Sequence, residues 1–134
     1  MKYSKLTPQQ RRARRYAQNY PYLEAKADSL ADMRQAIRYD TDKVQVSPED
    51  KMFERAIELD DCITAMRKID HSLWIAFGVD MEPAKQVICY QRTRESVERD
   101  PHFWKMKYTQ YRWDRMCKDF YSVLWMAIKP DEED

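Results

Sequence analysis

A hydroxyl residue, an amide and two arginines lie close together in the C-terminal part of the chain, in a pattern that suits DNA binding. Thr109 and Gln110 come first, and Arg112 and Arg115 follow among large apolar residues. A threonine before a helix accepts hydrogen bonds from the first free backbone amides. A glutamine amide can form two hydrogen bonds with a base edge, and arginine can bind bases or phosphates. The pattern therefore predicts a helix that enters a DNA groove.

Two further groups of basic residues could bind DNA phosphates. Lys105 and Lys107 precede the predicted groove helix and could flank the groove. A second cluster near the N-terminus could add salt-dependent contacts with the DNA backbone. Its members are Arg11, Arg12, Arg14 and Arg15. The alternative for all of these residues is an ordinary helix surface, on which basic side chains lie in solvent or pair with acidic ones.

The segment Met106–Arg115 resembles the second helix of the helix-turn-helix in the ArpU/RinA-type phage late-gene transcription regulators, where Thr-Tyr-Tyr-Arg-like residues lead into a long amphipathic helix. The resemblance includes Tyr20–Glu24, at the start of a helix, and Val44–Pro48, which is similar to the linker before the family's middle helix. At Glu95–Trp104 other residues replace the family's Trp-x-x-Ile-Ala helix and turn. The resemblance implies a DNA-binding regulator of late operons.

The glycine and proline content predicts an all-α fold. Gly78 is the only glycine, which argues against sandwiches, barrels and phosphate-binding loops, since these need residues that tolerate positive φ. Proline suits the first turn of a helix, where its missing amide costs no hydrogen bond. Five prolines precede segments with helical spacing, so we expect about five helices; these prolines are Pro8, Pro21, Pro48, Pro83 and Pro101.

The middle of the sequence predicts one long central helix. Apolar residues recur there every three or four positions, which keeps one helix face apolar. Such a helix would form the core of a bundle or one half of a dimer seam. Ile63 lies near the centre of this apolar stripe and is expected to be buried. The stripe consists of Met52, Ala56, Leu59, Ile63, Met66, Ile69 and Leu73.

The length of 134 residues suits one domain, and charge is distributed unevenly along it. We expect a single helical domain over residues 1–129, followed by an acidic tail, 130–134. Within the domain, 1–20 form a basic N-terminal helix, 21–83 an acidic helical core, and 84–129 a basic part with a helix-turn-helix-like unit. The net charge is only +1, but basic ends can still bind DNA because exposed charges beyond about 10 Å are largely screened at physiological salt.

Aromatic residues crowd the C-terminal quarter and allow two interpretations. In proteins that bind single-stranded nucleic acids, such rings stack with bases. Spacings of three, four or seven residues favour packing in a core or a dimer interface instead. The residues are Phe103, Trp104, Tyr108, Tyr111, Trp113, Phe120, Tyr121 and Trp125.

The sequence offers little support for an enzyme, a metal site or a cofactor. His71 and His102 belong to no His-Glu-x-x-His motif, and the three cysteines form no Cys-x-x-Cys pair. An odd number of widely spaced cysteines is typical of a reducing cytosol. No apolar run approaches the roughly 20 residues of a membrane span. We therefore expect a non-enzyme without cofactor in the cytoplasm of a bacterial host cell.

These features together predict a phage or prophage transcription regulator that binds double-stranded DNA, as a homodimer whose two copies read two half-sites. The alternative is a small phage protein that kept a regulator-like helical fold but binds and inhibits a host protein, such as RNA polymerase or a defence complex. The acidic middle segment and tail favour this alternative, since acidic surfaces can occupy sites built for nucleic acid. A structural helical dimer of the virion is a third possibility.

Overall fold

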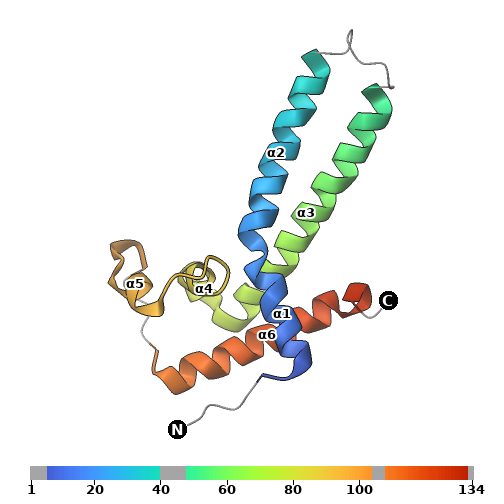
Figure 1. Cartoon of the computed structure of the whole chain (residues 1–134). Helices are drawn as coiled ribbons and strands as arrows, with labels where there is room; N and C mark the ends of the chain where they lie inside the picture. Colours follow the sequence, from blue (N-terminus) through green and yellow to red (C-terminus); the bar gives the residue numbers. More distant parts are fainter. Residues whose placement is uncertain (1–5, 40–47, 104–107, 133–134) are drawn as a thin grey trace. The chain divides into compact units, whose positions relative to one another are not determined.

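The computed structural model describes residues 6–39, 48–103 and 108–132, and these residues form helices without a strand (Figure 1). The predicted all-α fold and its long central helix, α3, are confirmed. The α-helices are α1 (Pro8–Gln18), α2 (Tyr20–Tyr39), α3 (Pro48–Phe77), α4 (Met81–Ile88), α5 (Arg94–Arg99) and α6 (Gln110–Glu132), and two short 3-10 helices are η2 (Gly78–Asp80) and η3 (Pro101–Phe103).

Helix starts follow the predicted chemistry. Pro8 is the first residue of α1, and Pro48 is the first residue of α3. Before α1, the Thr7 hydroxyl accepts a hydrogen bond from the Gln10 amide at 3.1 Å. The Gln10 side chain accepts one from the Thr7 amide at 3.0 Å, which completes a capping box. Thr93 caps α5 in the same way, through the amide of Ser96.

The chain divides into two compact units, which are described separately. Residues 21–67 form the helix-pair unit, in which α2 and the first part of α3 lie side by side (Figure 1). Its core contains Ala27 and Leu30 from α2 and Cys62 from α3, with Leu59 and Met66 packed against them. Ile63 is only partly buried, so the buried face of α3 is centred nearer Cys62 than the sequence predicted.

Residues 1–20 and 68–134 form the second unit, here called the α6 unit. Its core is built around α6, where Phe120, Leu124 and Ile128 are almost fully buried. Ala13 and Ala17 are also fully buried on α1, and such small side chains let α1 pack closely on α6. The side-chain amide of Gln10 on α1 also donates a hydrogen bond to the Ser122 hydroxyl on α6, at 3.1 Å. This hydrogen bond ties α1 to α6.

A polar triad lies within the α6 unit, where Tyr20 and Lys85 are buried and Asp70 is partly exposed. The Lys85 ammonium lies 2.8 Å from the Asp70 carboxylate and donates a hydrogen bond to the Tyr20 hydroxyl at 2.7 Å. The Tyr20 hydroxyl donates to the second carboxylate oxygen of Asp70 at 3.0 Å. Each of the three side chains contacts the other two through a hydrogen bond or an ion pair. A charged group that is removed from water needs such partners. The triad therefore links the start of α2 to α3 and α4.

Gly78 ends α3 in a left-handed conformation, with a φ of +60°. A Cβ at this position would meet no atom within 4 Å, so the cost of Gly78→Ala is conformational rather than steric. We expect the substitution to lower the free energy of unfolding by about 1–2 kcal/mol, measured by urea denaturation. Gln91 also has a positive φ, of 57°, so Gln91→Gly is the control and should cause no loss. Equal losses would show that backbone conformation is not the cause.

Candidate nucleic-acid interface

The N-terminal end of α6 is capped as the sequence predicted. The Thr109 hydroxyl accepts a hydrogen bond from the Arg112 amide at 3.2 Å. The Thr109 carbonyl accepts one from the Trp113 amide at 2.9 Å. Trp113 is buried, whereas Arg112 and Arg115 are exposed. The first turns of α6 are thus anchored on one side and present two arginines to solvent on the other.

Gln110 is exposed, but both ends of its amide are already bound. The nitrogen donates to the Asp114 carboxylate at 3.0 Å. The oxygen accepts from the Arg94 guanidinium at 3.1 Å. Arg94 is itself held by Glu98 and by the Tyr108 carbonyl. Gln110 therefore has to exchange these hydrogen bonds before it can contact a base edge.

Arg112 is positioned by the aromatic ring of Tyr108, one of the residues for which the sequence allows either packing or base stacking. Its guanidinium carbon lies 5.2 Å from the centre of the Tyr108 ring, which is within range of a cation–π interaction. The Tyr108 hydroxyl donates to the carboxylate of Asp80. Burial and this carboxylate raise the pKa of Tyr108 to about 12. Tyr108 therefore stays neutral at physiological pH and supports Arg112.

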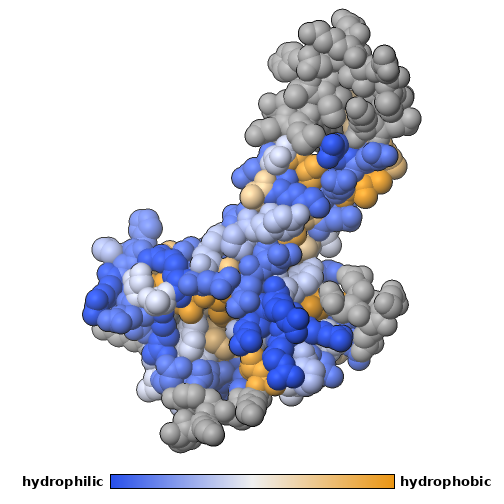
Figure 2. Space-filling model, viewed as in Figure 1, coloured by the Kyte–Doolittle hydropathy of each residue, from blue (hydrophilic) through white to orange (hydrophobic). Residues whose placement is uncertain are grey.

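The N-terminal arginine cluster lies on α1, and all four of its side chains are exposed. In the part of the chain that the structure describes, none of them has a carboxylate within ion-pair distance. Arg11 donates only a long hydrogen bond, of 3.5 Å, to the Leu6 carbonyl. The helix has no acidic residue. Figure 2 shows strongly hydrophilic residues gathered over α1. The four residues are Arg11, Arg12, Arg14 and Arg15.

A groove of about 250 Å³ runs between α1 and α6. Arg14 and Lys118 contribute basic groups to its walls, and Cys117 lies in it. Burial and the nearby Asp114 carboxylate raise the pKa of the Cys117 thiol to about 12. Because the thiolate is the reactive form of cysteine, this raised pKa disfavours nucleophilic and metal-binding chemistry at Cys117 near neutral pH.

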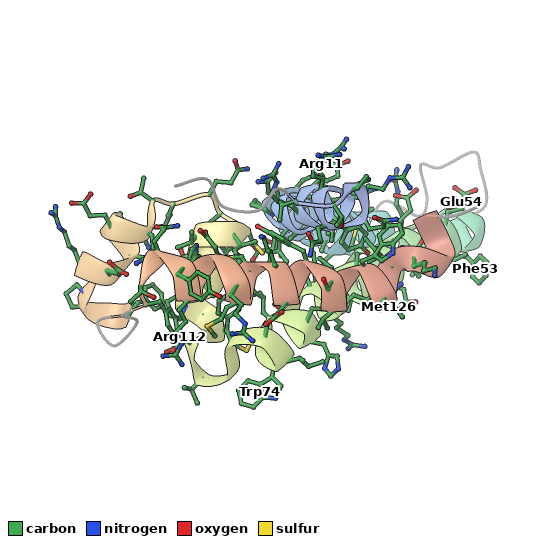
Figure 3. All side chains as sticks on the ribbon, turned by 90° about the horizontal axis from the view of Figure 1, so that it is seen from below. Arg11, Phe53, Glu54, Trp74, Arg112 and Met126 are labelled. Carbon is green, nitrogen blue, oxygen red and sulfur yellow. The ribbon has the colours of Figure 1, made fainter. Side chains whose placement is uncertain are left out.

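The structure brings the predicted site residues together in two groups rather than one. Thr109, Gln110, Arg112 and Arg115 lie at the start of α6, and the four arginines of the cluster lie on α1. Figure 3 shows Arg11 and Arg112 on opposite sides of α6. Lys105 and Lys107 lie outside the described residues.

The connection that precedes α6 is longer than the turn of a compact helix-turn-helix. Residues 100–109 separate α5 from α6, and they include η3. A helix-turn-helix joins its two helices through about three or four residues. The first turns of α6 are held instead by Arg94 from α5 and by Asp80, through Tyr108. Sequence reasoning missed these supports, because they lie 16 and 28 residues away from their partners.

Comparisons with protein-family models, with curated proteins and with solved structures found no match. In the described ranges, no helix combines the length and apolarity needed to cross a membrane. Nor do the described histidines, cysteines and carboxylates gather in threes as a metal site requires.

Proposed function

We propose that the chain is a phage or prophage transcription regulator that binds double-stranded DNA mainly through α1. The observation that carries the DNA-binding part is the set of four exposed arginines on α1, which have no carboxylate partner among the described residues. Arginine keeps its charge at any physiological pH. Each arginine that contacts a phosphate releases counterions from the DNA and so favours binding. The assignment to a phage regulator rests on the resemblance of the C-terminal residues.

The arginines of α5 and its flanks are less suited to this role, because they are already paired. Arg92 contacts Asp100, Arg94 contacts Glu98, and Arg99 contacts Glu95. A phosphate would have to replace these carboxylates, whereas no described carboxylate competes for the α1 arginines. Pairing, rather than the number of arginines, favours α1 as the DNA-binding surface.

The α1 helix is also well ordered for binding. Its capping box fixes the first turn, and its alanine face packs on α6. Arg11 and Arg15 lie on the opposite face, because residues two positions from Ala13 point away from it at 100° per residue, and Arg12 lies between the two faces. A rigid helix loses little conformational entropy on binding. The arginines are thus held in position for contacts with the DNA backbone.

The finer proposal concerns sequence recognition by α6. Arg112 and Arg115 are exposed at its start and would read base edges, and Gln110 would join them after releasing Arg94 and Asp114. Because Arg112 and Arg11 lie on opposite sides of α6, Arg112 and the α1 arginines would contact different DNA segments (Figure 3). Their contributions can therefore be measured separately.

Neutralising two arginines of α1 tests the main proposal. We expect Arg11→Gln with Arg15→Gln to weaken binding to every duplex and to reduce the salt dependence by about 0.9 per lost contact, or about 1.8 in total. Fluorescence polarisation of a labelled duplex over a range of salt measures this slope. Arg99→Gln is the matched control, since Arg99 is paired with Glu95. An equal change of slope in the α1 variant and in Arg99→Gln would show that α1 does not provide the phosphate contacts.

Arg112→Ala tests recognition by α6. Base contacts specify a sequence, whereas phosphate contacts only position the protein. We therefore expect a loss of about 1–3 kcal/mol on the preferred sequence, selected from a random duplex pool, and little loss on random DNA. Asp119→Asn, at another exposed position of α6, serves as a control. Equal losses from Arg112→Ala on both DNAs would contradict base reading.

A further inference from the structure

A second charged surface lies on α3, in the helix-pair unit. Phe53 and Ile57 are large apolar residues that are 68% and 47% exposed. They lie one helical turn apart, with Glu54 and Asp61 along one side and Asp60 along the other, as 100° per residue places them. Figure 3 shows Phe53 and Glu54 projecting from the ribbon. These five residues are here called the acidic stripe.

Among the residues whose side chains are described, the acidic stripe is not part of the core of its own unit. Leu59, Cys62 and Met66, on the other face of α3, make the contacts with α2. Among the described residues, the nearby ion pair joins Arg55 to Glu58, and no cation lies within ion-pair distance of the three carboxylates of the stripe. Exposed apolar residues rimmed by polar ones mark an interaction surface.

The chemistry of the stripe defines what can cover it. The occupant must bring cations to the carboxylates and apolar groups to Phe53 and Ile57. Arginine provides both, because its aliphatic stem covers apolar surface while its guanidinium reaches outward. A guanidinium can also lie over a phenylalanine ring as a cation–π pair. A helix with arginines one turn apart therefore fits the stripe.

The α1 helix of this chain has that composition. Arg11 and Arg15 are one turn apart, as Phe53 and Ile57 are, and α1 carries no acidic residue. The arginines of α1 and the carboxylates of the stripe are both exposed and both lack described partners of opposite charge. We propose that α1 of a second copy docks on the acidic stripe of α3.

The contact joins two different surfaces, so it is heterologous. It also occupies the face of α1 that the proposed function assigns to DNA. The competition with DNA that follows rests on that proposed function. Self-association and DNA binding are then mutually exclusive at α1. Duplex DNA competes with the stripe for the arginines, so added duplex should dissociate the associated protein.

Sedimentation equilibrium of the full chain tests the docking. Wild type should associate at about 0.01 M salt, where the screening length is about 30 Å, and be monomeric at about 1 M salt, where it is about 3 Å. Arg11→Glu with Arg15→Glu should abolish association at low salt, and so should Glu54→Lys with Asp61→Lys. All four positions are exposed, and circular dichroism checks that the helices remain.

An equimolar mixture of the two variants gives the decisive result. Each variant alone lacks one of the two matching surfaces, but in the mixture the unchanged α1 of one variant meets the unchanged stripe of the other, and the two reversed surfaces also match in charge. We expect the mixture to associate at low salt. A monomeric wild type at low salt, unchanged association of either variant, or a monomeric mixture would each overturn the proposal, and would leave the stripe to another basic partner. Asp119→Lys, on α6, is the matched charge reversal and should leave association unchanged.

The test of the docking and the test of the proposed DNA binding give distinguishable results. Glu54→Lys with Asp61→Lys leaves α1 intact, so this variant should bind duplex at least as tightly as wild type while it no longer associates. Association of the mixture without any duplex binding would support the docking and reject the DNA-binding function. Duplex binding with a monomeric mixture would reject the docking alone.

Discussion

Replacement of Phe120 by alanine is expected to destabilise the protein by about 3–5 kcal/mol. Phe120 is completely buried on α6. Its ring centre lies 6.4 Å from that of Phe77 and 5.5 Å from that of Tyr121. The substitution removes apolar burial and leaves a cavity that rigid neighbouring helices fill only in part. Urea denaturation followed by circular dichroism measures the loss.

Met126→Ala is the matched control for this prediction. Met126 lies on the same helix, but it is 69% exposed. Substitutions at such positions change stability by about 0.5 kcal/mol or less. A similar loss from Phe120→Ala and from Met126→Ala would mean that the buried face of α6 is not the one described.

Lys85→Met is expected to cost about 1–3 kcal/mol. Removal of one partner of a fully buried ion pair costs about 3–5 kcal/mol. The Asp70 side chain is 36% exposed, so water compensates for part of the loss. Methionine keeps most of the apolar stem but leaves Tyr20 and Asp70 without the ammonium. Urea denaturation near neutral pH measures the difference, and a gain in stability would contradict the stabilising role of the triad.

The same residue predicts a loss of stability at high pH. Burial alone would lower the pKa of Lys85, but hydrogen bonds to Asp70 and Tyr20 outweigh it and raise the pKa above the ordinary 10.5. The charged triad therefore contributes its full stability below that value and loses it as the pH rises through the folded-state pKa. Burial also raises the pKa of Tyr20, which acts in the same direction. As the pH rises above about 10.5, wild type should lose more stability than Lys85→Met; equal losses would contradict this cause.

Local chemistry made the helices predictable. Single residues near a helix start determine its cap, so Thr7, Pro8 and Thr109 could be assigned from the sequence. Which residues of α3 face the core was harder to predict, because the apolar stripe of this helix is broad. Which edge of such a stripe is buried depends on the partner helix, and Ala27 and Leu30 of α2 place Cys62, rather than Ile63, in the core.

The arrangement of the candidate site depended on contacts that no local pattern encodes. Arg94 binds the amide of Gln110, and Asp80 accepts from Tyr108, although both pairs are distant in sequence. The separation of Arg11 from Arg112 follows from the side of α6 on which α1 packs (Figure 3). Residue types therefore identified the candidate groups, but the fold decided which of them can act together.

The claim that α1 binds the DNA backbone is tested most directly by the salt dependence of wild-type binding. Four phosphate contacts predict a slope of about −3.6 for the logarithm of the binding constant against the logarithm of salt concentration, at about −0.9 for each contact. The variant in which Arg11, Arg12, Arg14 and Arg15 are all glutamine should lose most of this slope and most of its affinity for random duplex. Identical slopes and affinities in the two proteins, or a wild type that does not bind duplex, would contradict the claim.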